Sequence, residues 1–225
     1  MKRVPGWLAV VAFGALLLLP GLGRLGALDS TDARYLAIGR EMWATGDWLV
    51  PRLAGVPHLD KPPLTYWAAS LGYTLFGPTE FGGRFVEQLA LLATALVVYR
   101  AARRFADPRW ALPAALIVRT SGLTFALSRG LATDLFQLLF VRASLVAILD
   151  AATRRSFAHA AAAGALLGVA MLAKGPIALL VAASVWLAFA IAVRERASLP
   201  WRGVALGAAL FAAIGVPWYA LIMQG

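Results

Sequence analysis

Long apolar runs without a single charge are the feature that most constrains this chain. Two runs contain no acidic or basic side chain: residues 7–23 (WLAVVAFGALLLLPGLG) and residues 175–193 (GPIALLVAASVWLAFAIAV). Each is about as long as the roughly 17–25 apolar residues that a helix needs to cross a bilayer. Of all residues, 61% are hydrophobic, against roughly 45–50% in soluble domains. The sequence therefore predicts an all-α, polytopic membrane protein.

The first apolar run lies near the N-terminus, where a cleaved signal peptide would also lie. It is longer than the roughly 7–15 residues of a typical apolar signal region, and no small-residue cleavage site follows it. We therefore expect it to remain as a membrane helix. About seven spans are expected, at 7–27, 82–100, 110–127, 135–150, 157–173, 176–193 and 203–223.

Charged residues divide between the two sides of these expected spans. Basic residues gather on one side: Lys2, Arg3, Arg100, Arg103, Arg104, Arg109, Arg154, Arg155, Arg194, Arg196 and Arg202. Acidic residues gather on the other: Asp29, Asp32, Glu41, Asp47, Asp60, Glu80, Glu87 and Asp134. Cytoplasmic loops carry the excess of Lys and Arg. We therefore expect a multi-pass protein of the inner (plasma) membrane, with its N-terminus in the cytoplasm and the acidic side facing the periplasm or exterior.

The same distribution explains the formal net charge of +10. A nucleic-acid partner is not expected, because no basic stripe with interleaved aromatic residues is present. The chain contains no cysteine, which excludes disulfides and thiolate metal sites.

A long outer loop, residues 28–81, separates the first two expected spans and contains two amphipathic segments. The stretch STDARYLAIGREMWATGDW has apolar residues at helical spacing, with Ser30 or Thr31 as the expected N-cap. The stretch PPLTYWAASLGYTLFG (62–77) has proline in its first turn, where the missing N–H costs nothing. We expect both segments to form helices that lie in the plane of the membrane interface.

The sequence HLDKPP (58–63) directly precedes the second of these helices. Lys61 is held extended because a proline follows it, so Asp60 and Lys61 are expected at the mouth of a helix N-terminus. Free N–H groups and the helix dipole favour a phosphate there, and the Lys61 ammonium adds a point charge suited to phosphate. The Asp60 carboxylate could hold a metal ion or a polar partner.

Three further polar clusters lie at outer span ends: DSTDARY (29–35), SRGLATD (128–134) and LAKGP (172–176). Each also has a purely structural explanation. Acids at helix starts commonly act as caps. Arg129 and Asp134 could form an ion pair, and a lysine at a span end commonly extends toward the lipid headgroups.

Taken in order, these clusters resemble the GT-C membrane glycosyltransferases that use polyprenyl-phosphate sugars. The closest group is the lipid A aminoarabinose transferases and protein O-mannosyltransferases, families 83 and 39. Their first loop typically reads D-E-x-R-Y-A-E-I-A-R-E-M … G-D-W-x-x-P … E-K-P-P-L-x-Y-W, and this chain has TDARYLAIGREMWATGDWLVPRLAGVPHLDKPPLTYW. The later R-L-x-x-T-D and L-x-K-G-P motifs are present as RGLATD and LAKGP. The resemblance covers nearly the whole chain and implies the N-terminal part of such an enzyme (1–225), without its C-terminal spans and soluble domain.

The resemblance also implies roles by position. Catalytic carboxylates are implied at Asp29 or Asp32 and at Asp134. Cations that bind the donor phosphate are implied at Lys61, Arg34 and Lys174, and a divalent metal ion, the one cofactor suggested, at Asp60. Thr31 stands where the family often has Asp, so the choice between Asp29 and Asp32 stays open.

The implied reaction is transfer of a sugar from a polyprenyl phosphate to a hydroxyl of lipid A, a protein or another glycan. The implied partners are membrane lipids and the missing C-terminal half as a separate chain. Two other classes stay open. One is an inactive fragment or non-catalytic membrane subunit. The other is a transporter or flippase, to which Arg119 and Arg142 inside expected spans would point.

Overall fold

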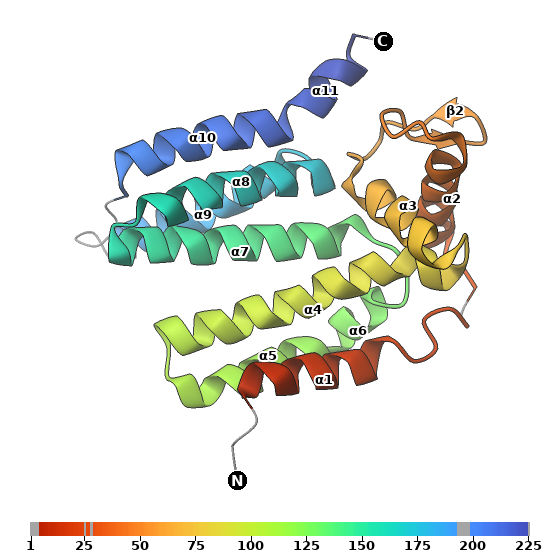
Figure 1. Cartoon of the computed structure of the whole chain (residues 1–225). Helices are drawn as coiled ribbons and strands as arrows, with labels where there is room; N and C mark the ends of the chain where they lie inside the picture. The colour runs from red at the N-terminus through yellow and green to blue at the C-terminus, as the bar shows by residue number, and fades with distance from the viewer. Residues whose placement is uncertain (1–4, 25, 28, 193–198, 225) are drawn as a thin grey trace. The chain divides into compact units, whose positions relative to one another are not determined.

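The computed structural model of the chain describes residues 5–24, 26, 27, 29–192 and 199–224 (Figure 1). Lys2, Arg3, Arg194 and Arg196, which contribute to the expected orientation, lie outside these described residues. Helices dominate, as the apolar runs predict. The elements in chain order are α1 (Gly6–Leu18), α2 (Ser30–Thr45), β1 (Arg52–Leu53), β2 (Val56–Pro57), α3 (Leu64–Phe76), α4 (Glu80–Phe105), the 3₁₀ helix η1 (Pro108–Trp110), α5 (Ala111–Thr120), α6 (Gly122–Leu127), α7 (Thr133–Arg154), α8 (Phe157–Lys174), α9 (Ile177–Ala192), α10 (Trp201–Gly215) and α11 (Pro217–Ile222).

Four of the described helices are long and apolar enough to cross a membrane: α4, α7, α8 and the continuous segment Trp201–Ile222 that contains α10 and α11. α1 and α9 are shorter apolar helices. The expected span 110–127 is interrupted, because Ser121 adopts φ −55° and ψ 128° and separates α5 from α6. The multi-pass helical architecture is thus confirmed, while the count of seven spans stays a prediction.

The chain divides into two compact units, Met1–Leu59 with Thr65–Phe136, and Asp60–Leu64 with Gln137–Gly225. In the first unit, α1, α4 and α5 pack around Val10, Ala95 and Ala115. Arg119 is fully buried beside them, and its Nη2 donates to the carbonyl of Gly14 at 3.1 Å. This guanidinium therefore joins α5 to α1.

The segment between α1 and α4 folds into two helices, α2 and α3, as expected, and the short antiparallel hairpin β1–β2 lies between them in the chain. Tyr35, Ile38 and Met42 of α2 form a core with Tyr66 and other buried side chains of α3. Figure 1 shows the two helices next to the first turns of α4. The amphipathic spacing thus places the buried face of α2 correctly.

The hydroxyl residues Ser30 and Thr31 do not cap α2 as expected, whereas the alternative expectation of a cap by an acid of DSTDARY is confirmed. Asp29 is the N-cap, and one of its carboxylate oxygens accepts the N–H groups of Thr31 and Asp32 at 2.7 and 2.8 Å. Ser30 and Thr31 already lie inside the helix. A side chain caps most effectively from the residue before the first helical turn, and Asp29 occupies that place.

The second unit consists of α8 to α11 with most of α7. α8 and α10 pack so closely that a Cβ on Gly164 would meet the backbone of Gly207. Small residues at helix crossings let membrane helices associate through close backbone contact. Val141 of α7 forms a second cluster with Ala170 and Ala178, which joins α7 to α8 and α9.

Candidate functional site

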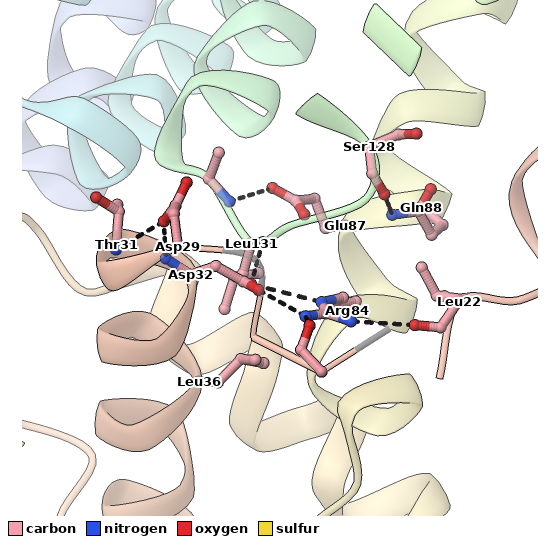
Figure 2. A network of polar contacts seen from close by, with 12 residues as sticks. Leu22, Asp29, Thr31, Asp32, Leu36, Arg84, Glu87, Gln88, Ser128 and Leu131 are labelled. Carbon is pink, nitrogen blue, oxygen red and sulfur yellow. Dashed lines mark hydrogen bonds and ion pairs between the residues drawn. The ribbon is translucent and has the colours of Figure 1, made fainter. Parts of the chain in front are cut away.

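A buried ion pair joins α2 to the start of α4 (Figure 2). Asp32 on α2 is 2% exposed and Arg84 on α4 is 0% exposed. Arg84 Nη2 lies 2.5 Å from Asp32 Oδ2, and its Nε lies 3.4 Å from Oδ1. A bidentate pair of this kind fixes orientation as well as contributing energy. It therefore sets where the N-terminus of α2 lies relative to α4.

Arg84 also fixes the connection between α1 and α2. Its Nη1 donates to the carbonyl of Leu22 at 3.1 Å, and its Nη2 donates to the carbonyl of Gly26 at 3.0 Å. One guanidinium therefore satisfies the carbonyls of two residues that lie between α1 and α2 in the chain. Because buried backbone groups need partners, the Arg84 side chain stabilises the backbone at Leu22 and Gly26, which precede α2 in the chain.

The turn that precedes α7 is held by side chains of α2 and α4 (Figure 2). Asp32 Oδ1 accepts the N–H of Leu131 at 2.7 Å, and Glu87 Oε1 accepts the N–H of Ala132 at 2.7 Å. Gln88 Nε2 donates to the carbonyl of Ser128 at 2.8 Å. Two carboxylates on consecutive N–H groups thus fix the turn just before Asp134.

Arg129, in the same turn, forms hydrogen bonds to backbone carbonyls at the end of α1. Its Nη1 and Nη2 donate to the carbonyls of Pro20 and Leu17 at 3.0 and 2.9 Å. Its guanidinium also lies 4.5 Å from the centre of the Phe125 ring. The last carbonyls of a helix lack intrahelical partners, so Arg129 caps the end of α1.

Two of the predicted carboxylates, Asp29 and Asp32, belong to this network, and Asp134 follows in the chain the turn that the network holds. Asp29 and Asp134 are exposed, whereas Asp32 is buried and accepts hydrogen bonds on both oxygens. Arg34 is half-buried on the same helix as Asp32. Asp32 is therefore poorly placed to take a proton from a substrate, and Asp29 and Asp134 are better placed.

Lys61, Asp60 and Lys174 belong to the other unit. Lys61 Nζ lies 3.0 Å from Asp60 Oδ2, and the two side chains are 31% and 58% exposed. An exposed pair of this kind contributes at most about 1 kcal/mol, so a phosphate could displace the carboxylate at little cost. Lys174 is the last residue of α8 and is half-buried.

The metal expected at Asp60 finds little support in the donor set. Among the described residues, no group of three or more His, Cys, Asp or Glu side chains could hold a metal ion. Asp60 is engaged by Lys61 instead. The metal stays a prediction, and the residues of this chain assign no chemical step to it.

Arg84, Glu87 and Gln88 are the site residues that the motifs did not single out. They occupy positions i, i+3 and i+4 of one helix and so share a face. All three are buried, with exposed fractions of at most 2%. Polar residues on one face at the start of an apolar span indicate a buried polar site, because such residues face the protein interior rather than lipid.

Glu87 gives a test of how the turn is held. In Glu87→Gln the amide oxygen still accepts the Ala132 N–H, so we expect little change in thermal stability. In Glu87→Ala this N–H loses its partner, which costs about 1–3 kcal/mol when the group is buried. Thermal unfolding in detergent measures both variants, and faster amide exchange at Ala132 in Glu87→Ala alone would locate the effect. Equal losses in the two variants would contradict the assignment.

Comparison with known proteins places the chain in a family and matches its fold. A model of the dolichyl-phosphate-mannose-protein mannosyltransferase family matches residues 60–220. The undecaprenyl phosphate-alpha-4-amino-4-deoxy-L-arabinose arabinosyl transferase of Edwardsiella ictaluri is 34% identical over 232 aligned residues, which cover 100% of this chain and 41% of that protein. The protein of the same name from Pseudomonas aeruginosa (strain UCBPP-PA14) is 33% identical, with 97% and 40% covered.

Two crystal structures of ArnT from Cupriavidus metallidurans share the fold at 27% identity. The apo structure has a TM-score of 0.85 and covers 97% of this chain. The structure bound to undecaprenyl phosphate has a TM-score of 0.87 and covers 99%. The chain spans about two-fifths of the length of these relatives. With the family model matching more than half of its residues, the chain belongs to the dolichyl-phosphate-mannose-protein mannosyltransferase family.

Proposed function

We propose that this chain takes part in transferring a sugar from a polyprenyl phosphate to an acceptor hydroxyl at the outer face of the inner membrane. The observation that carries the proposal is the turn before α7, which the side chains of Asp32 and Glu87 hold beside the buried Arg84 and which leads to Asp134. The arabinosyl transferase names of the relatives, and the undecaprenyl phosphate bound to one of them, support a donor of that class. Because the names of these relatives specify it, the proposed sugar is 4-amino-4-deoxy-L-arabinose.

The acceptor hydroxyl has to lose its proton as it attacks the anomeric carbon. Asp134 is the proposed general base, because it is exposed and follows directly after the fixed turn. Asp29 is the second candidate, since only one of its oxygens is engaged in capping. Asp32 is assigned a positioning role. A well-placed base contributes roughly 10²–10⁴-fold to the rate.

The leaving group of this reaction is a lipid phosphate, whose negative charge grows as the sugar departs. Lys61 is proposed to stabilise that charge, with Arg34 and Lys174 as supporting cations. The double proline after Lys61 restricts the backbone before α3, because a proline disfavours the helical conformation of the residue that precedes it. Both prolines are also buried. Removing a donor that stabilises developing charge commonly costs roughly 10²–10³-fold in rate.

The test separates lipid binding from transfer. Undecaprenyl phosphate is titrated into the purified protein in mild detergent and counted by native mass spectrometry. Transfer is measured with the aminoarabinose-charged lipid and lipid A. We expect Lys61→Ala to weaken lipid binding at least about tenfold, because one charge-assisted bond is lost. We expect Asp134→Asn to keep lipid binding and to lose at least about 100-fold in transfer.

Two matched variants control for nonspecific effects. Lys61→Arg keeps the cation and should restore most of the lipid binding. Arg109→Ala removes an exposed cation from a different loop, near Trp110, and should leave lipid binding and transfer unchanged. Wild-type transfer by both Lys61→Ala and Asp134→Asn would overturn the site assignment. Binding of undecaprenyl phosphate without transfer by the wild-type protein would favour a non-catalytic subunit.

A further inference from the structure

A cavity of about 370 Å³ lies along the exposed side of α2. It is lined by Ala27, Ala33, Leu36, Ala37, Arg40, Glu41, Ala44, Tyr73 and Glu80. These residues come from α2, from α3, from the first turn of α4 and from the segment before α2. The volume falls within the range of small-molecule sites. None of the residues predicted to bind the donor phosphate or to act as a base lines it.

The floor of this cavity is apolar although it lies on the exposed side of a helix. Ala33, Ala37 and Ala44 are all exposed, and spacings of four and seven residues place them along one face of α2. A helix face in contact with water alone typically carries charged residues. Three alanines instead leave a shallow apolar strip, on which methylene groups can lie.

The rim of the cavity carries charges of both signs. Arg40 Nη2 donates to the carbonyl of Pro78 at 2.7 Å, and the guanidinium carbon lies 5.9 Å from the centre of the Tyr73 ring. These two contacts hold the cation at the cavity, while a guanidinium has further N–H donors to offer. Burial raises the pKa of the Tyr73 phenol to about 12. The phenol is therefore neutral, and it donates to the carbonyl of Leu36 at 3.0 Å.

Two carboxylates complete the rim. Glu41 Oε1 accepts the N–H of Gly55 at 2.9 Å, which leaves its second oxygen available. Glu80 is half-buried, and within the described part of the chain its carboxylate forms no hydrogen bond or ion pair. A carboxylate of this kind prefers a donor that carries positive charge. The rim thus offers a cation for an anionic group and carboxylates for a cationic group.

We propose that this cavity binds a membrane phospholipid whose headgroup carries both a phosphate and a primary ammonium, as in phosphatidylethanolamine. Arg40 takes the phosphate, Glu80 and Glu41 take the ammonium, and the alanine strip takes the glycerol and first methylenes. A purely anionic headgroup satisfies Arg40 alone and is repelled by two carboxylates. A choline headgroup has the charges but no N–H to donate. The chemistry therefore selects the primary amine.

Native mass spectrometry in dodecyl maltoside tests the proposal with three lipids of identical chains: dioleoyl phosphatidylethanolamine, phosphatidylcholine and phosphatidylglycerol. We expect the wild-type protein to retain one phosphatidylethanolamine at least about tenfold more tightly than either other lipid, as one charge-assisted hydrogen bond allows. Glu80→Gln should remove the preference over phosphatidylcholine. Equal retention of all three lipids, or retention of none, would overturn the proposal.

Three variants separate this site from a general loss of structure. Ala37→Trp fills the exposed strip without changing any charge, and it should abolish the preference in a protein of unchanged melting temperature. Arg24→Gln removes an exposed cation that does not line the cavity and should leave the preference intact. Lys61→Ala should also leave it intact. Loss of phosphatidylethanolamine in Lys61→Ala but not in Ala37→Trp would place the lipid elsewhere and refute the assignment.

Discussion

Replacing Arg84 by methionine is expected to destabilise the first unit by about 3–5 kcal/mol, the usual cost of breaking a buried ion pair by removing one partner. The substitution leaves the Asp32 carboxylate, 2% exposed, without its cation. It also leaves the carbonyls of Leu22 and Gly26 without their donor. Because domains are stable by only about 5–15 kcal/mol, this loss should lower both accumulation in the membrane and the melting temperature.

The effect of the charge can be separated from that of the side-chain volume. Arg103→Met makes the same substitution at an exposed position of the same helix, where Arg103 contacts only the Tyr99 ring among the described partners. It should change the free energy of unfolding by no more than about 0.5 kcal/mol. The double variant Asp32→Leu with Arg84→Met should recover part of the loss, because no unpaired charge then stays buried.

Thermal unfolding in detergent, followed by tryptophan fluorescence, measures these three variants together with the single variant Asp32→Leu. Non-additivity in the double variant is the direct measure of coupling between contacting residues. If Arg84→Met unfolded at the wild-type temperature, Arg84 would not hold the network together. If the double variant were as unstable as the sum of its single substitutions, the pair itself would contribute nothing.

Most of the helical architecture could be predicted from the sequence, because apolar runs and amphipathic spacing report directly on burial. The amphipathic spacing predicted that α2 buries one face, and Tyr35, Ile38 and Met42 form that face. The interruption at Ser121 was not predicted, although Arg119, Thr120 and Ser121 form a polar stretch within the run 110–127 and Gly122 follows it. A break in a span depends on which backbone groups find partners elsewhere, and that is decided by packing rather than by local propensity.

Only part of the candidate site could be predicted from the sequence. The motifs indicated Asp29, Asp32 and Asp134, but not that Asp32 is occupied by Arg84 and by the Leu131 N–H. Those partners lie 52 and 99 residues away in the chain, and no local pattern encodes such a contact. The sequence likewise offered several caps for α2, the hydroxyls of Ser30 and Thr31 and the acids of DSTDARY, and only the backbone geometry chooses Asp29.

The second large effect is expected at Gly164, where α8 crosses α10. A Cβ there would meet the carbonyl and Cα of Gly207, which are backbone atoms and cannot rotate away. Gly164→Ala therefore has to push the two helices apart, and overpacking that moves backbone costs about 1–3 kcal/mol or more. In a membrane, close packing itself drives helix association, so the loss should fall on the second unit as a whole.

The same substitution at Gly122 provides the control. A Cβ on Gly122 would meet no atom within 4 Å. Alanine is the better helix former by roughly 1 kcal/mol, so Gly122→Ala should be neutral or slightly stabilising. Limited proteolysis and thermal unfolding of the two variants in detergent decide the matter. A Gly164→Ala protein as stable as Gly122→Ala would mean that α8 and α10 can separate freely, and the glycines would then serve helix flexibility rather than contact. A loss confined to Gly164→Ala would mean that the contact between these two backbones holds the second unit together.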